Sequence, residues 1–153
     1  MMYKILFIIG LMSLVSSCAS ITGKQLREDP AGVYSFKVNG NYKTAYDKAL
    51  LHARSCYELK AAGNTFVVKG SESPENRKSS LSIARVRALS DETVFIVDIA
   101  QTDDANTEVK VYYAQLRYKT AAMTVEDWIN KDSNACNMGK VILECVCFLV
   151  DQH

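Results

Sequence analysis

The segment TVFIVDIAQ, residues 93–101, decides the fold class of this chain. Successive residues of an extended strand point to opposite faces of a sheet, and here both faces are apolar. Thr93, Phe95, Val97 and Ile99 form one face, and Val94, Ile96 and Ala100 form the other. A short run that is apolar on both faces is typical of a buried strand, so we predict a central strand here.

Two similar segments flank this strand: SLSIARVRA at residues 80–88 and TEVKVYYAQLRY at residues 107–118. The gaps between the segments are short and polar, SDE at 90–92 and TDDAN at 102–106. Such gaps indicate hairpins, because antiparallel strands can be joined by a few residues whereas parallel strands need a long crossover. We therefore predict an antiparallel meander.

A strand, a helix and a further strand are expected before the meander. VYSFKV at 33–38 alternates apolar and polar residues, as a half-buried strand does. Asn41 then caps a helix whose apolar residues recur at steps of three and four, and which ends before Ala61-Ala62-Gly63. TFVVK at 65–69 predicts a short strand, and GSESPENRKS at 70–79 predicts a polar loop.

A second helix is expected after the meander. Thr124-Val125-Glu126-Asp127 resembles a capping box with Thr124 as the cap, and the apolar pattern continues until the helix stops near Gly139. VILECVCFLV at 141–150 has ten residues, whereas a membrane span needs about 20. That segment suits a buried last strand better than a span.

The order of these elements predicts an α+β fold. The arrangement that satisfies it is a two-layer α/β sandwich, with a mainly antiparallel sheet of four to five strands and two helices on one face. We expect residues 33–153 to form a single domain, because a chain of this size buries enough apolar surface for one core.

The N-terminal residues have the three regions of a secretory signal. Lys4 supplies the charge, ILFIIGLMSLV at 5–15 supplies a short apolar run, and small residues follow. Leu14-Val15-Ser16-Ser17-Cys18 resembles the lipobox of bacterial lipoproteins, which implies cleavage after Ser17 and a diacylglycerol on Cys18. Two alternatives remain: ordinary cleavage after Ala19, or retention of the segment as an N-terminal anchor.

The resemblance to lipoproteins also implies a location. In that family an Asp after the lipidated cysteine commonly retains the protein at the inner membrane, and here the position holds Ala19. We therefore expect the outer membrane, facing the periplasm, in a Gram-negative cell, and otherwise the cell membrane. Gly32-Val33-Tyr34-Ser35-Phe36, leading into an amphipathic helix, is similar to the start of small uncharacterised envelope lipoproteins.

Residues 18–32 are interpreted as the lipidated cysteine and a flexible tether. The stretch is polar and is interrupted by Pro30 and Gly32, so we expect the folded part to begin near Val33. A flexible coil of that length spans roughly 20 Å, which would hold the domain just clear of the lipid headgroups.

Charge argues against a nucleic-acid partner. Removing residues 1–17 takes Lys4 from the 18 Lys plus Arg, which leaves 17 against 17 Asp plus Glu. A nearly neutral chain lacks the positive charge that phosphate contacts require. The expected partners are instead the membrane, through the anchor, and an envelope protein.

Four cysteines besides that of the lipobox remain. We prefer a Cys56–Cys136 disulfide, because the periplasm is oxidising and each residue lies toward the end of a helix expected to cover the same sheet. The alternative is that both are small buried apolar residues. Cys145 and Cys147 are weak candidates for a soft-metal site, with Cys136 or His153 as further ligands, and an ordinary place in the core is the preferred interpretation.

Few residues suggest catalysis. His52 lies beside the apolar stripe of the first helix, so we interpret it as a helix-surface histidine, and no nucleophile has an obvious partner. Arg85 with Arg87, and Arg117 with Lys119, each place two cations on one side of a predicted strand. A solvated sheet face is the preferred interpretation of these cations. The alternative is a site for an anionic ligand, such as a lipid headgroup phosphate or a cell-wall carboxylate.

These observations favour a membrane-anchored lipoprotein without enzymatic activity and without a cofactor other than its lipid. It would act by binding, as an accessory subunit or a ligand-holding module, through the exposed sheet face or an edge strand. The alternative function is a cysteine-based metal-binding or redox protein of the periplasm.

Overall fold

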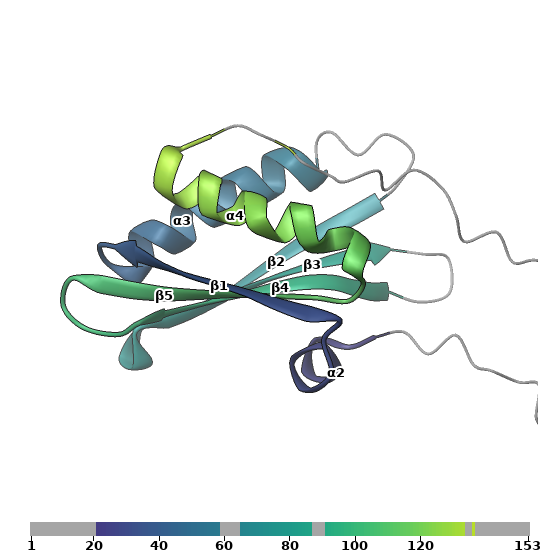
Figure 1. Ribbon diagram of the computed structural model, residues 1–153, viewed down its shortest axis with the longest axis horizontal. Helices are drawn as coiled ribbons and strands as arrows, with labels where there is room; N and C mark the ends of the chain where they lie inside the picture. The colour runs from purple at the N-terminus through teal and green to yellow at the C-terminus, as the bar shows by residue number, and fades with distance from the viewer. Residues whose placement is uncertain (1–20, 59–64, 87–90, 134–135, 137–153) are drawn as a thin grey trace, which may run out of the picture.

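The computed structural model describes residues 21–58, 65–86, 91–133 and 136, and its centre is a five-stranded antiparallel sheet (Figure 1). The strand order is β1-β5-β4-β3-β2. The strands are β1 (Gly32–Asn39), β2 (Thr65–Ser73), β3 (Lys78–Val86), β4 (Asp91–Gln101) and β5 (Asn106–Tyr113). β4 is the middle strand, which confirms the prediction made from its two apolar faces.

Strands β2 to β5 form the predicted meander, and β1 pairs with β5 as the last neighbour. The register of β3 with β4 shifts at one point, because Ile83 lies opposite Phe95 and Ala84 opposite Thr93. The residue skipped on β4, Val94, therefore forms a bulge, and its carbonyl accepts a hydrogen bond from the Ala114 amide at 3.0 Å.

Two helices, α3 (Tyr42–Ala53) and α4 (Lys119–Lys131), cover one face of the sheet, as predicted (Figure 1). The Asn41 side chain accepts a hydrogen bond from the Thr44 amide at 2.8 Å, so this cap is confirmed. After α3 the chain widens into a π-helical turn, η2 (Arg54–Glu58). Trp128 is the largest side chain that is almost fully buried between the helices and the sheet.

The second helix differs from the prediction at both ends. A 3₁₀ turn, η4 (Leu116–Tyr118), leads directly into α4 at Lys119, so the strand predicted to reach Tyr118 ends earlier. The Thr124 hydroxyl donates to the Thr120 carbonyl at 3.0 Å, as a residue inside a helix does. The predicted cap at Thr124 was therefore wrong, and the helix ends at Lys131 rather than near Gly139.

The predicted loop at 70–79 is largely strand. β2 continues to Ser73 and β3 begins at Lys78, with only the 3₁₀ turn η3 (Pro74–Asn76) and Arg77 between them. The segment is polar because this end of the hairpin carries four consecutive exposed residues, 69–72. A strand that is exposed on both faces has no apolar alternation to reveal it.

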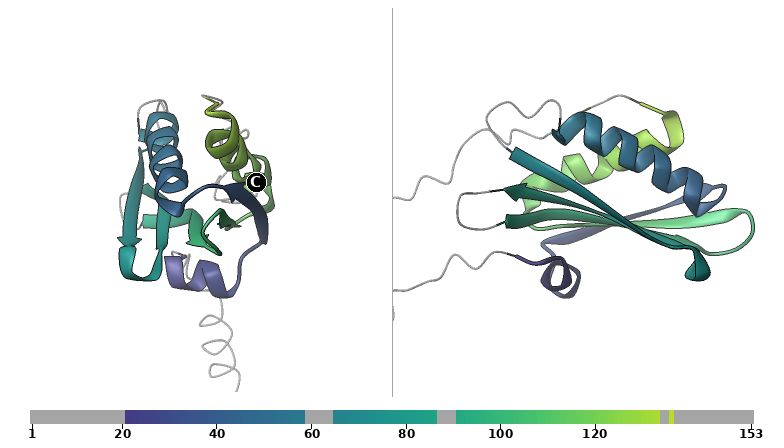
Figure 2. Two further views of the ribbon diagram at one scale, coloured as in Figure 1. Left: turned by 90° about the vertical axis from the view of Figure 1, so that its left-hand side faces the viewer. Right: turned by 180° about the vertical axis from the view of Figure 1, so that it is seen from behind.

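A third helix, α2 (Gly23–Glu28), lies on the opposite face of the sheet (Figure 2). The Thr22 side chain caps it and the Gln25 side chain returns to the Thr22 backbone, which completes a capping box. Leu26 is fully buried against the sheet. The folded part therefore begins by Thr22, and the prediction that it begins near Val33 after a flexible tether was wrong.

Candidate functional site

The face of the sheet that α3 and α4 leave uncovered carries a row of polar residues across all five strands. In register these are Ser71, Ser80, Asp98, Lys110 and Ser35. The next row toward the β2–β3 and β4–β5 turns is also polar except at one position, and consists of Ser73, Lys78, Ala100, Glu108 and Lys37. Because alternate residues share a face, both rows lie on the side opposite the core.

Arg27 of α2 is held at the centre of the first row. Its Nε and Nη2 atoms donate to the two Asp98 carboxylate oxygens at 2.7 Å each, and Nη2 also reaches the Ser80 hydroxyl at 2.8 Å. The hydrogen bond to Asp98 raises the pKa of Arg27. A bidentate pair of this kind fixes orientation as well as charge. α2 is therefore attached to the sheet by the buried Leu26 side chain and by one oriented ion pair, and the Thr93 amide also bonds to the Ile21 carbonyl just before the helix.

Beyond Arg27 the residues of these rows on β2 to β5 line an open groove of about 450 Å³, which we call the sheet groove. Its lining includes Ser71, Ser73, Lys78, Ser80, Asp98, Glu108 and Lys110. A smaller hollow of about 300 Å³ adjoins it, because Ser71 and Ser80 line both, and Arg27 borders the second. Hydroxyl groups and charges of both signs thus line one continuous surface beside α2.

The charges of the sheet groove are mostly paired. Glu108 lies 3.2 Å from the Lys110 ammonium, and Asp98 is occupied by Arg27 and by the Ser80 hydroxyl. A paired carboxylate is a hydrogen-bond acceptor of fixed position rather than a free charge. The groove therefore suits a polar partner with dispersed hydrogen-bonding groups better than a single strongly charged ligand.

Arg85 does not lie on this face. It is a partly buried residue of β3 on the helix side, where its guanidinium lies 5.9 Å from the centre of the Phe66 ring. Its Nη2 donates to the Tyr118 hydroxyl at 2.5 Å, and Arg117 lies 5.1 Å above the same tyrosine ring. The interpretation of Arg85 as part of a solvated sheet face was wrong, because its neighbours on β3, Leu81 and Ile83, face the core.

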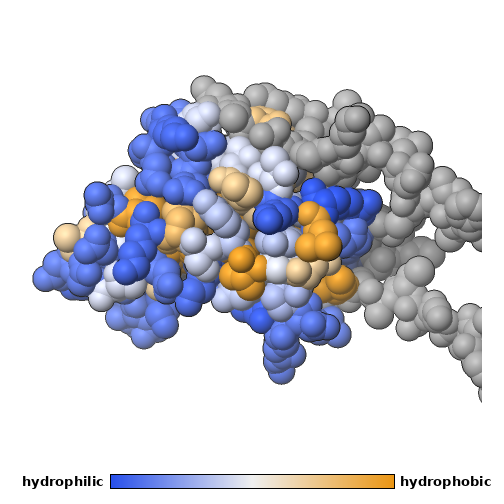
Figure 3. Space-filling view, in the orientation of Figure 1, coloured by the Kyte–Doolittle hydropathy of each residue, from blue (hydrophilic) through white to orange (hydrophobic). Residues whose placement is uncertain are grey.

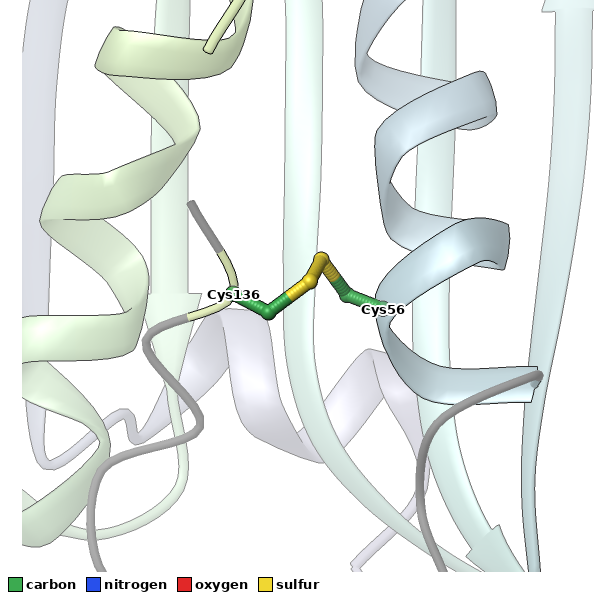
Figure 4. The surroundings of a disulfide bond; sticks show 2 residues. All are labelled: Cys56 and Cys136. Atoms are coloured by element: carbon green, nitrogen blue, oxygen red, sulfur yellow. A yellow bond between two sulfur atoms is a disulfide. The ribbon is translucent and has the colours of Figure 1, made fainter. Parts of the chain in front are cut away.

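The predicted disulfide is confirmed: Cys56 of η2 is bonded to Cys136, with a Cα–Cα distance of 5.4 Å (Figure 4). Cys56 is almost fully buried. The bond joins the end of the α3–η2 segment to the chain that follows α4, so it closes the helix layer at one side. Its position indicates a structural role.

His52 is buried rather than on the helix surface, so the prediction was wrong. Its Nε2 lies 3.0 Å from the Asp132 carboxylate, and its ring stacks on Trp128 with 6.3 Å between ring centres. The hydrogen bond with His52, aided by the charge of Lys48, lowers the pKa of Asp132. Asp132 occupies the left-handed region at the end of α4, with φ at 52°, which turns its carboxylate toward α3. The pair therefore links α3 to α4.

Several predicted sites lie outside the residues that the structure describes: Cys18, Arg87, Cys145, Cys147 and His153. Within the described ranges, no three His, Cys, Asp or Glu side chains are grouped so that they could hold a metal ion. No helix in those same ranges is long and apolar enough to cross a membrane.

Sequence reasoning missed Arg27 and the sheet groove. A signal for α2 was present, since Thr22 and Gln25 have the spacing of a capping box. No local signal was available for the groove, because it depends on which residues of different strands lie opposite one another.

Comparison with known proteins gives a family but no activity. No curated protein matches the chain. A family model described as "Protein of unknown function (DUF3568)" matches residues 1–132, from the signal-like N-terminus to the end of α4. That match takes in α2, the whole sheet and both helices of the covered face, although not Cys136. Because the model matches most of the chain, this protein belongs to the DUF3568 family of proteins of unknown function.

Proposed function

We propose that this protein is a lipid-anchored envelope protein without enzymatic activity, which binds a protein partner in the sheet groove. The lipobox-like segment ending at Cys18 supports the anchor, and Ala19 after it supports the outer membrane, facing the periplasm, in a Gram-negative cell. The observation that carries the binding function is the sheet groove itself, with its polar rows and the Arg27–Asp98 pair beside it.

The chemistry of the groove favours a protein as the partner. Protein interfaces carry dispersed hydrogen bonds, about one per 100–200 Å² of buried surface, rather than one dominant charge. Ser71 and Ser73 contribute hydroxyls, which can both donate and accept, and Lys78 and Glu108 add charges of both signs. Complementary charges of this kind favour the correct partner over wrong ones.

Binding rather than catalysis also fits the placement of the histidine. Of the residues that the structure describes, His52 is the only histidine, and it lies on the helix side of the sheet in a bond to Asp132. A general base must be within hydrogen-bonding reach of the group that it deprotonates. His52 is therefore unsuited to act on a ligand in the groove.

The competing function, a metal-binding or redox protein, would depend on cysteines. Cys56 and Cys136 are joined to each other, and Cys145 and Cys147 lie outside the described residues. No described contact therefore favours this second function over the first.

The anchor is tested by labelling cells with a radioactive fatty acid. The wild-type chain should incorporate label, and Cys18→Ser should not, because the thiol that takes the diacylglycerol is gone. Continued labelling of Cys18→Ser would contradict the anchor. Fractionation of the same cells should then place the wild-type chain with the outer membrane.

The groove is tested by photo-crosslinking in whole cells, with a photoreactive amino acid at position 73 or, as a control, at position 131. Ser73 lines the groove, whereas Lys131 is exposed at the end of α4 on the other side of the sheet. We expect one defined protein adduct from position 73 that is absent from position 131 and is lost when Lys110→Glu changes the groove charge. Adducts of equal yield and identity from both positions would contradict the proposal.

A further inference from the structure

The first described residue is fixed to the sheet very close to the proposed lipid. The Ile21 carbonyl accepts a hydrogen bond from the Thr93 amide at 3.1 Å, at the beginning of β4. Three residue steps separate Ile21 from Cys18, and three steps span at most about 11 Å when fully extended. Ile21 is therefore held within that distance of the lipidated cysteine, and Thr93 at the start of β4 lies one hydrogen bond farther.

This distance leaves almost no room between the domain and the membrane. A bilayer has a hydrocarbon core of about 30 Å within a total of about 40–45 Å, so each headgroup layer is about 5–8 Å deep. The acyl chains on Cys18 place that residue at the boundary of the core. The remaining reach beyond the headgroups is about the length of one side chain, so the end of the sheet near Ile21 must contact the headgroups.

That end of the domain exposes large apolar side chains. The Ala114 amide donates a hydrogen bond to the carbonyl of Val94, the residue after Thr93, so Ala114 lies at this end of the sheet. Leu116 follows Ala114 by two residues, at the start of η4. Leu116 is 71% exposed, and Val33, at the start of β1, is 45% exposed. Figure 3 shows apolar surface on this half of the molecule, where β1 and α4 begin.

Cations accompany the apolar residues. Arg117 and Lys119 are exposed, and Arg85 lies next to Ala84, which is opposite Thr93. The guanidinium groups of Arg85 and Arg117 both approach the Tyr118 hydroxyl, at 2.5 and 3.4 Å. Asp91 and Glu92 begin β4 at the same end, with Glu92 opposite Arg85 in register. Guanidinium groups match the geometry of phosphate oxygens and are weakly hydrated, which suits them to a headgroup layer.

We propose that this end of the domain, which we call the anchor end, lies on the phospholipid headgroups, with Leu116 inserted among them and Arg117 on a headgroup phosphate. The proposal rests on the lipid anchor of the proposed function and adds a defined orientation to it. The single lipidated residue would then be assisted by a contact surface, in the way that a second signal strengthens attachment to a membrane.

This orientation places the sheet groove away from the membrane. β4 rises about 3.3 Å per residue, so Asp98 lies about 16 Å and Gln101 about 26 Å along the strand from Thr93. The two polar rows of the groove cross β4 at Asp98 and Ala100. The β4–β5 turn, at the opposite end of the sheet from the beginning of α4 in Figure 1, would point into the periplasm.

The test uses the full lipidated chain in vesicles of phosphatidylethanolamine and phosphatidylglycerol that contain a radiolabelled phospholipid. A photoreactive amino acid replaces Leu116 or, as the control, Ala105 in the β4–β5 turn. We expect a labelled lipid adduct from position 116 and none above background from position 105. A lipidated chain that gives no adduct at 116, or equal adducts at both positions, would overturn the orientation while leaving the anchor intact. A wild-type chain without lipid on Cys18 would overturn both proposals.

A second measurement examines the contact itself. With the photoreactive residue at position 33, Leu116→Asp combined with Arg117→Glu should abolish most of the lipid adduct, because the anionic headgroups would repel the two new carboxylates. Leu51→Asp is the matched control, since Leu51 is similarly exposed, at 66%, but lies on α3. It should leave the adduct unchanged, and an equal loss in both variants would contradict a specific contact by the anchor end.

Discussion

The covered face of the sheet and the face that carries α2 are closed by different kinds of interaction. Under α3 and α4 the contacts are mainly apolar and include aromatic rings at near right angles, such as Tyr57 on Phe95 and on Trp128. On the other face one leucine and one arginine attach a six-residue helix, and the surface that lines the sheet groove is mainly polar. The hydrophobic contribution is proportional to the apolar area removed from water, so nearly all of it lies on the covered face.

This difference separates stability from recognition. A fully buried apolar layer stabilises the fold, but its side chains are not accessible to a binding partner. The α2 face is held by directional bonds, which fix the positions of Ser80 and Asp98 beside the sheet groove without filling it. Substitutions on the covered face should therefore lower the free energy of unfolding, whereas those on the α2 face should alter the groove and the anchor end first.

The largest effect is expected from Trp128→Ala on the covered face. Trp128 is 1% exposed, and truncation of a buried tryptophan removes its apolar contacts and leaves a cavity. We expect the free energy of unfolding to fall by about 3–5 kcal/mol, measured by denaturant titration of the purified protein. Met123→Ala, an exposed change on the same helix, is the control and should cost less than about 0.5 kcal/mol. Equal losses in both variants would contradict the assignment of the core.

Leu26→Ala tests the α2 face and should have a smaller and more local effect. Leu26 is fully buried, and a buried Leu→Ala change costs about 2–5 kcal/mol. We expect a value of about 2 kcal/mol, because a helix of six residues can detach while the rest of the sheet stays folded. Hydrogen exchange should show loss of protection in α2 and retention of protection in β4. Global loss of protection would mean that α2 belongs to the main core.

The contrast between the two faces also explains how much could be predicted from sequence. β4 could be identified because a strand that is buried on both faces is a continuous run of apolar residues. The helix cap at Asn41 could be identified because it depends on one side chain and the backbone three residues later. α2 escaped prediction because six residues are too few for a helical period to show. The sheet groove could not be predicted, since no local pattern brings Ser71, Asp98 and Lys110 into one row.

The errors on the covered face have a related cause. Thr124 matched a capping pattern, but the 3₁₀ turn at 116–118 had already started the helix, so tertiary packing overrode the local signal. The disulfide was predicted correctly from the expectation that two helices share one face, although Cys136 lies beyond α4 rather than within it. The prediction of the disulfide was therefore correct although the predicted end of the second helix was wrong.

Arg27→Ala should have a smaller effect on stability than Leu26→Ala. The Arg27 and Asp98 side chains are 40% and 29% exposed, and a partly exposed ion pair contributes about 1 kcal/mol or less. The expected main effect is greater mobility of α2, seen as faster proteolysis within residues 23–28. Lys24→Ala is the matched control on the same helix, because its pair with Glu28 is exposed and does not reach the sheet. Equal protease sensitivity in the two variants would show that the Arg27–Asp98 pair does not hold α2 on the sheet.

The smallest effect is expected from Asp132→Asn: a small loss of stability above about pH 4 that disappears in acid. The His52 hydrogen bond lowers the pKa of Asp132 in the folded protein, so the ionised form is favoured by folding. That stabilisation is fully present above the unfolded pKa of about 3.9 and is lost as the pH falls through the lower folded value. Asp132→Asn should therefore reduce the slope of stability against pH in that acid range, measured by denaturant titration at a series of pH values.

Asp103, whose pKa is lowered by Asn106 in the β4–β5 turn, gives an independent comparison, because it lies at the end of the sheet and not between the helices. If Asp132→Asn left the acid slope unchanged while Asp103→Asn reduced it, the bond between His52 and Asp132 would contribute nothing to stability, and the remaining contacts between α3 and α4 would hold the two helices together.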